Sequence, residues 1–135
     1  HLDNFSKLSA LLPPFDKGLA SLIDRLKERG LFRSTAIMVA GEFGRTPKIN
    51  GQGGRDHWAR AMFALMAGGD VEGGQVIGET DDRAGAPVGK GYSPDDLAAS
   101  FFQNIGINSK HEFQTNVGRP INLVRDGKPI SQLFS

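Results

Sequence analysis

The sequence predicts an α/β fold, on the basis of two short uncharged apolar runs and two amphipathic helical patterns. The apolar runs cover residues 35–40 and 62–67, and in neither run do polar and apolar residues alternate. Strands that are apolar on both sides are typical of parallel sheets whose two faces are both covered. We therefore expect both runs to be central strands of a parallel sheet.

The clearer helical pattern covers residues 14–30. Its apolar residues recur at helical period and form one stripe, made of Phe15, Leu19, Leu22, Ile23 and Leu26. Two prolines, at positions 13 and 14, suit an N-terminal boundary, and Gly30 suits a C-terminal position with positive φ. The pattern predicts a helix that packs against the rest of the protein with one face only.

A second helix is expected over residues 93–107. Ser93 is a candidate N-cap, Pro94 fits the first helical position, and Gly106 closes the apolar stripe. Two weaker signals predict a short strand at residues 75–77 and a hairpin around Asp126-Gly127. Between the two helices the chain is rich in glycine and proline, which indicates an irregular middle.

Charge and composition exclude several function classes. The 135 residues include 16 Lys plus Arg against 15 Asp plus Glu, a formal charge of +1, so no broad basic face is expected and no nucleic-acid partner. The apolar runs are far shorter than the roughly 20 residues that span a bilayer, so no membrane span is expected. The absence of cysteine excludes disulfides, thiolate metal sites and cysteine nucleophiles.

The stretch 41–58, which follows the first predicted strand, is the candidate functional loop. In open α/β sheets ligands bind beyond the carboxyl ends of strands. The loop contains possible metal ligands at Glu42, Asp56 and His57 and possible anion-binding groups at Arg45, Lys48 and Arg55. The residues taken singly leave other roles open: a turn hydrogen bond for the aspartate, a solvated loop acid for the glutamate, and surface ion pairs for the arginines.

Three motifs give the chain a family resemblance: Glu-Phe-Gly-Arg-Thr-Pro at 42–47, Gly-Arg-Asp-His-Trp at 54–58 and Gly-Gly-Gln-Val at 73–76. They resemble the bacterial domain-of-unknown-function family numbered 1501, which itself looks like a branch of the alkaline phosphatase and sulfatase superfamily. The resemblance implies the C-terminal part of an alkaline-phosphatase-like three-layer fold, with a mostly parallel central sheet flanked by helices. Residues 1–135 would be the C-terminal fragment of a single such domain, whose remainder lies N-terminal to His1.

The resemblance also implies a metal centre. Glu42 stands at the place of the first superfamily ligand, and Phe43 stands where the superfamily has a histidine. His57, with Asp56 beside it, resembles a later ligand. His1 resembles the histidine of an Asp-x-His motif. The implied metal ligands are His1, Glu42, Asp56 and His57, and the implied catalytic residues are Arg45 and Arg55.

The function implied by the resemblance is part of a metal-dependent hydrolase of phosphate or sulfate esters. The cofactor would be a divalent metal (Zn, Mn, Mg or Ca), and the substrate a small anionic ester or a sulfated carbohydrate. The nucleophile is expected upstream of His1, so this chain alone would be inactive, and the protein would be exported or periplasmic. Two alternatives stay open: a catalytically degenerate relative that binds an anionic ligand, which the phenylalanine at position 43 favours, and a structural module of an exported protein.

Overall fold

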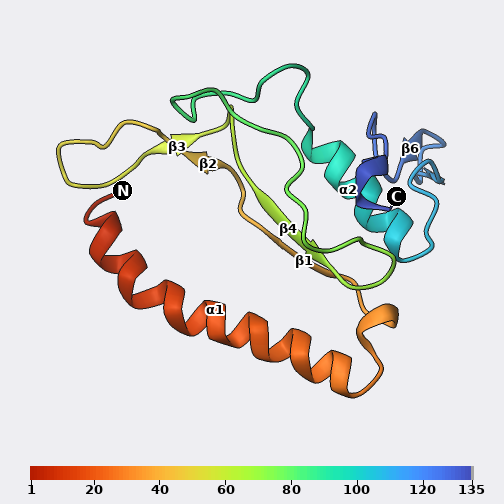
Figure 1. Ribbon diagram of the computed structural model, residues 1–135. Coiled ribbons are helices and arrows are strands. Elements are labelled where there is room, and N and C mark those ends of the chain that lie inside the picture. The colour runs from red at the N-terminus through yellow and green to blue at the C-terminus, as the bar shows by residue number, and fades with distance from the viewer. Residues whose placement is uncertain (135) are drawn as a thin grey trace.

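The computed structural model describes residues 1–134, and Figure 1 shows the arrangement of their helices and strands. The helices of this range are α1 (Asn4–Glu28) and α2 (Pro94–Asn104), with two 3₁₀ turns at Phe32–Ser34 and Ser131–Leu133. The strands are β1 (Ile37–Ala40), β2 (Gly44–Arg45), β3 (His57–Trp58), β4 (Ala64–Ala67), β5 (Glu112–Gln114) and β6 (Pro120–Asn122). Neither helix of the described range combines the length and the hydropathy that crossing a bilayer requires.

The expected parallel sheet is wrong. Both predicted strands exist, as β1 and β4, but they pair with each other antiparallel, from Ile37 opposite Ala67 to Ala40 opposite Ala64. The pairs β2–β3 and β5–β6 are also antiparallel and two-stranded. A parallel pair needs a crossover, usually through a helix, whereas residues 41–63 hold only the β2–β3 pair and return the chain to the same end of β1.

The two apolar strands are also not covered on both faces. Side chains of β1 alternate between half-buried and exposed, and Met38 on β1 is 41% exposed while Leu65 on β4 is 46% exposed. A run of apolar residues is therefore not enough to predict that a strand is covered on both faces. The described residues form no mostly parallel sheet flanked by helices, so the three-layer arrangement is corrected together with the strand direction.

Helix α1 is longer than predicted and has no buried residue. It begins at Asn4, so Pro13 and Pro14 lie inside it and not at its start. Each proline removes one helical hydrogen bond but keeps a helical φ, and Phe5 and Leu8 extend the apolar stripe toward the N-terminus. The predicted end is confirmed, because Gly30 follows the helix with φ 68°.

Helix α2 begins as the sequence predicts. Ser93 is its N-cap: the Asp96 backbone N–H donates to Ser93 Oγ at 3.1 Å, and the Ser93 N–H donates to the Asp96 carboxylate at 2.9 Å. The buried face of α2 carries Ala99 and Ser100, and the Ser100 hydroxyl accepts the Ile130 N–H at 2.8 Å. This contact ties the C-terminal segment to α2, where the small core of the described residues lies.

The two weaker predictions are wrong. Residues 75–77 lie in no strand, and the C-terminal hairpin is β5–β6, closed by residues 115–119 and not by Asp126-Gly127. Gly127 instead lies against α2, since a Cβ added to it would collide with the Asp95 carbonyl oxygen. Close approach to a neighbouring backbone is therefore what this glycine provides, and not a hairpin turn.

Stability of the α2 region is expected to fall as the pH is lowered into the acid range. The Lys128 backbone N–H donates to the Asp96 carboxylate at 2.8 Å, and with the Ser93 hydrogen bonds it holds the pKa of Asp96 below its ordinary value. A lowered folded-state pKa gives stability that is complete above the unfolded-state pKa and is lost as the pH falls through the folded-state pKa. Thermal unfolding followed by circular dichroism across that range measures the loss.

The Asp96→Asn variant is the control for this pH dependence. It removes the titrating carboxylate, so its melting temperature should vary less with acid pH than that of the unmodified protein. An identical pH profile for the two proteins would contradict the assignment to Asp96.

The first residues of the chain lie against the loop between β2 and β3, and this contact positions the candidate site. The N–H groups of Asp3 and Asn4 donate to the carbonyls of Gln52 and Gly53 at 3.0 and 3.2 Å. In Figure 1 the N-terminus accordingly lies beside this loop, at the opposite end of α1 from β1. His1 is thereby brought next to residues that are about fifty positions away in the sequence.

Candidate functional site

The loop 46–56 is closed at its base by the short pair β2–β3. Gly44 is opposite Trp58 and Arg45 is opposite His57 in this antiparallel pair. Gly44 has to be a glycine here, because a Cβ on it would collide with the Ala61 carbonyl oxygen. The close approach of the Gly44 and Ala61 backbones holds β3, and with it His57, against β2.

Backbone and side-chain hydrogen bonds stiffen the loop above this base. The Thr46 N–H donates to the Asp56 carbonyl at 2.9 Å, and the Asp56 N–H donates to Thr46 Oγ1 at 3.1 Å. The Arg55 guanidinium donates to the carbonyls of Thr46 and Pro47 at 2.6 and 2.5 Å. Arg55 is half-buried, and its hydrogen bonds to Thr46 and Pro47 hold the two sides of the loop together.

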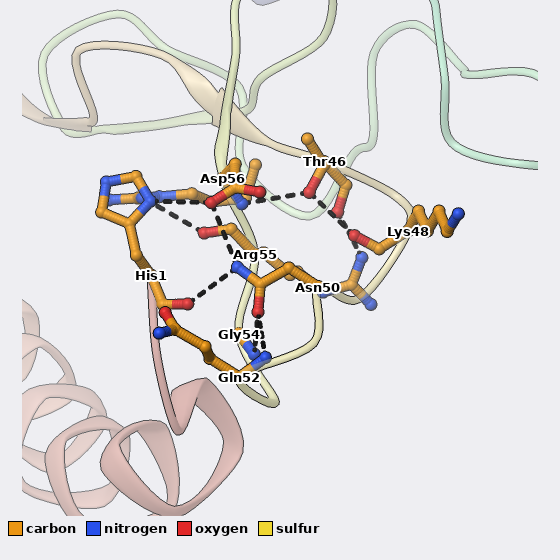
Figure 2. Close-up of polar contacts among 9 residues, drawn as sticks. His1, Thr46, Lys48, Asn50, Gln52, Gly54, Arg55 and Asp56 are labelled. Carbon is orange, nitrogen blue, oxygen red and sulfur yellow. Dashed lines mark hydrogen bonds and ion pairs between the residues drawn. The ribbon is translucent and has the colours of Figure 1, made fainter.

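Three of the predicted site residues come together at the edge of this loop. His1 Nδ1 lies 3.0 Å from Asp56 Oδ1, and the ring centroids of His1 and His57 are 4.6 Å apart. Figure 2 shows the His1 ring directed at the Asp56 carboxylate. His1 and Asp56 are about half exposed, at 52% and 55%, so the cluster is open to solvent and to a ligand.

The His1–Asp56 contact fixes the chemistry of the His1 ring. An ionised carboxylate is only an acceptor, so Nδ1 of a neutral His1 carries the proton and Nε2 keeps its lone pair. A histidine whose Nδ1–H donates to a carboxylate is the arrangement commonly found behind metal-ligating imidazoles. Asp56 is therefore placed to orient His1, and His1 Nε2 is the ring atom that remains able to ligate a cation.

Asn50 is a functional candidate that the sequence analysis missed. Its Nδ2 donates to the His1 carbonyl at 2.9 Å and to Asp56 Oδ1 at 3.1 Å. Its Oδ1 accepts the backbone N–H groups of Gln52 and Gly54, each at 3.0 Å. Figure 2 shows these hydrogen bonds converging on the one carboxamide. The Asn-Gly pair at 50–51 predicts a turn, and only that signal was available in the sequence.

Phe43 lies directly against the cluster. Its ring centroid is 3.9 Å from that of His57, with the two ring planes tilted by 39°. The His57 ring is thus in ring contact with both His1 and Phe43. Position 43, where the resemblance places a histidine ligand in the superfamily, is consequently in direct contact with the His57 imidazole.

Glu42 is not brought into the same cluster. It is exposed, and it lines an open groove between β4 and the segment 71–92. No hydrogen bond or ion pair joins it to His1, Asp56 or His57 among the residues that the structure describes. Glu42 stays a predicted ligand whose side chain the structure does not bring to the imidazoles.

The predicted catalytic arginines differ in their surroundings. Arg45 is exposed, its guanidinium lies 5.8 Å from the Phe43 ring, and its Nη1 is 3.4 Å from the Arg55 carbonyl. Arg55 lies 5.8 Å from the Phe5 ring and donates to loop carbonyls. Arg45, which is opposite His57 across the strand pair, is therefore the arginine better placed to meet an anion at the cluster.

The donor set fits part of a divalent metal site. Within residues 1–134 no group of three or more His, Cys, Asp or Glu side chains is gathered as a metal cage. Two imidazoles with a carboxylate behind one of them match the nitrogen ligands of zinc, which leaves other positions to water or substrate. The cluster by itself therefore offers two imidazoles and one carboxylate, which is not a complete set of metal ligands.

Comparison with known proteins gives one result. The family model described as "Protein of unknown function (DUF1501)" matches residues 1–134. No curated protein and no solved structure matches the chain.

Proposed function

The chain belongs to the DUF1501 family of proteins of unknown function, and from this premise we propose that it forms part of a metal-dependent hydrolase of phosphate or sulfate esters. The proposal includes the link from this family to the alkaline phosphatase and sulfatase superfamily. One observation carries it: two imidazoles from distant parts of the chain lie 4.6 Å apart, with a carboxylate 3.0 Å from the nearer nitrogen of one of them.

In the proposed site His1 and His57 hold the metal, and Asp56 keeps the His1 ring in the tautomer that exposes Nε2. A bound divalent cation would polarise phosphoryl or sulfuryl oxygens and lower the pKa of a bound water. The imidazole ligands favour zinc over manganese, magnesium or calcium, which prefer oxygen donors. Glu42 remains a candidate oxygen ligand, and its exposure leaves its side chain free to reorient.

Arg45 would bind the anionic part of the substrate. A guanidinium offers several N–H donors in one plane, which suits two oxygens of a tetrahedral phosphate or sulfate group. The Arg45 side chain is exposed and lies opposite His57 in the β2–β3 pair. Arg55 supports the same loop from inside by donating to its carbonyls, so we propose a positioning role for Arg55.

We propose further that the remainder of the same domain covers the apolar surfaces of this chain. The described residues expose 10018 Å², whereas a compact protein of 14.5 kDa exposes about 6,900 Å². Permanent interfaces bury about 2,000–5,000 Å² counted over both partners, so an excess of roughly 3,000 Å² on this side alone is enough for such an interface. It includes much of the α1 stripe, where Phe5, Leu12, Phe15 and Leu22 are each about half exposed.

The hydrolase proposal is tested with the complete protein in which this chain occurs. The assay follows release of 4-nitrophenol from 4-nitrophenyl phosphate and from 4-nitrophenyl sulfate, with Zn²⁺ or Mn²⁺ added and then removed by a chelator. Release that depends on the metal supports the proposal. Binding of phosphate or sulfate without release from either ester would instead favour the degenerate, ligand-binding relative.

The variant Phe43→His is expected to tighten Zn²⁺ binding by about tenfold or more, because it adds a third imidazole to a site with two. The ring at position 43 already lies 3.9 Å from the His57 ring, so a histidine there needs little rearrangement. Competition with a chromogenic chelator measures the affinity. Phe43→Leu is the matched control and should bind Zn²⁺ as the unmodified protein does; equal affinity of all three proteins would contradict the placement of position 43 at the metal.

A further inference from the structure

We propose that Asn50 is a positioning residue of this site: it sets the orientation of the Asp56 carboxylate and, through it, the tautomer of His1. This inference rests on the proposed metal centre for its consequence in binding, but the orientation of His1 is measurable without any metal. The argument depends on which atoms of the Asn50 carboxamide each partner uses.

The two ends of the Asn50 carboxamide act on different parts of the site. Its Oδ1 accepts the N–H groups of Gln52 and Gly54, which shapes the turn itself. Its Nδ2 donates to the His1 carbonyl and to Asp56 Oδ1, which are the backbone of one cluster residue and the side chain of another. One planar group therefore fixes the distance between the turn, the N-terminal segment and the carboxylate.

Asp56 Oδ1 is the shared acceptor in this arrangement. It accepts from Asn50 Nδ2 at 3.1 Å and lies 3.0 Å from His1 Nδ1. Both partners bind the same oxygen, so the amide limits how the carboxylate can rotate and holds that oxygen toward the His1 ring. Outer-sphere groups of this kind commonly change metal affinity by 10- to 100-fold when they are removed.

The substitution Asn50→Asp tests the donor Nδ2 and the acceptor Oδ1 of the side chain separately. Aspartate forms Asx turns as asparagine does, so its Oδ1 can still accept the N–H groups of Gln52 and Gly54. The donor is lost, however, and a carboxylate oxygen would face the His1 carbonyl and the Asp56 carboxylate, which repel it. A residue needed only for the turn would tolerate this change, and a positioning residue would not.

The experiment uses the complete protein labelled with ¹⁵N-histidine and combines two readouts. Long-range ¹H–¹⁵N spectra without metal, at an alkaline pH where imidazoles are neutral, report which nitrogen of His1 carries the proton. The exposed His111 serves as the internal reference. Competition titration then gives the Zn²⁺ affinity. We expect Asn50→Asp to lose the Nδ1–H preference of His1 and to weaken Zn²⁺ binding by about 10- to 100-fold.

Two further variants keep the test decisive. Asn122→Asp makes the same chemical change at an exposed position of β6 and should leave both readouts unchanged. Asn50→Ser, whose hydroxyl can accept in the turn but is too short to reach Asp56, replaces Asn50→Asp if that variant does not fold. If the turn variants fold and show the unmodified His1 tautomer and Zn²⁺ affinity, the inference is overturned.

The outcome also distinguishes this inference from the proposed function. If the unmodified protein binds no Zn²⁺, the metal centre fails, while the His1 tautomer in the metal-free protein still decides the role of Asn50. If Asn50 acts through Asp56, the double variant Asn50→Asp/Asp56→Asn loses no more affinity than the weaker-binding of the two single variants. Additive losses would contradict a common path through Asp56.

Discussion

Replacing His57 by alanine is expected to lower the affinity of the protein for Zn²⁺ by about 100-fold or more, because it removes one of two imidazole ligands. The His57 ring lies 4.6 Å from the His1 ring and 3.9 Å from the Phe43 ring. His1 and His57 are the two imidazoles of the cluster, so a variant without His57 keeps one. His111, the remaining histidine of the sequence, contacts Phe113 instead. Competition titration with a chromogenic chelator measures the loss.

Two variants control for effects on packing and on total histidine content. His57→Phe keeps an aromatic ring against Phe43 but has no nitrogen, so it should lose Zn²⁺ like the alanine variant while melting nearer to the unmodified protein. His111→Ala removes an exposed histidine away from the cluster and should bind Zn²⁺ normally. Retained affinity in both His57 variants would show that this imidazole is not a ligand.

The second large effect is expected from Gly54→Ala. Gly54 is buried, and a Cβ on it would collide with the His1 carbonyl oxygen and lie 2.7 Å from the Leu2 backbone nitrogen. Both are backbone atoms, so the N-terminal segment has to move away from the loop. We expect a loss of about 1–3 kcal/mol in stability, as for overpacked positions, and loss of the His1–Asp56 hydrogen bond.

Thermal unfolding and Zn²⁺ titration together measure the effect of Gly54→Ala. The affinity should fall by about tenfold or more as His1 is displaced from the carboxylate that orients it. Gly51→Ala is the matched control, because a Cβ at Gly51 has no heavy atom within 4 Å and the φ there is not positive. Equal effects of the two substitutions would contradict the proposed contact between the loop and His1.

The sequence predicted local features of the fold well, because local residues decide them. The Ser93 cap depends on Asp96 three positions later, and the end of α1 depends on Gly30. The direction of β1 and β4 depends instead on how residues 41–63 run between them, and an apolar run carries no information about that path. The start of α1 was wrong for a related reason, since prolines permit a helical φ and do not by themselves end a helix.

The candidate site was predictable only where a residue type already signalled its chemistry. His57 and Asp56 stand out as possible ligands, and the family resemblance added His1. Asn50 was missed because its role depends on contacts with His1 and Asp56, forty-nine and six positions away. Glu42 shows the opposite case: it is a suitable residue type in the stretch 41–58, but it lines the groove beside β4 and has no hydrogen bond to His1, Asp56 or His57 among the described residues.

The most direct test of the account is the X-ray absorption spectrum of the Zn²⁺-loaded protein at the zinc edge. Imidazole ligands give characteristic multiple scattering from the outer ring atoms, so their number can be fitted. We expect two imidazoles in the unmodified protein and one in His57→Phe. A zinc shell made of oxygen alone, unchanged in the His57 variant, would contradict a metal centre built on His1 and His57.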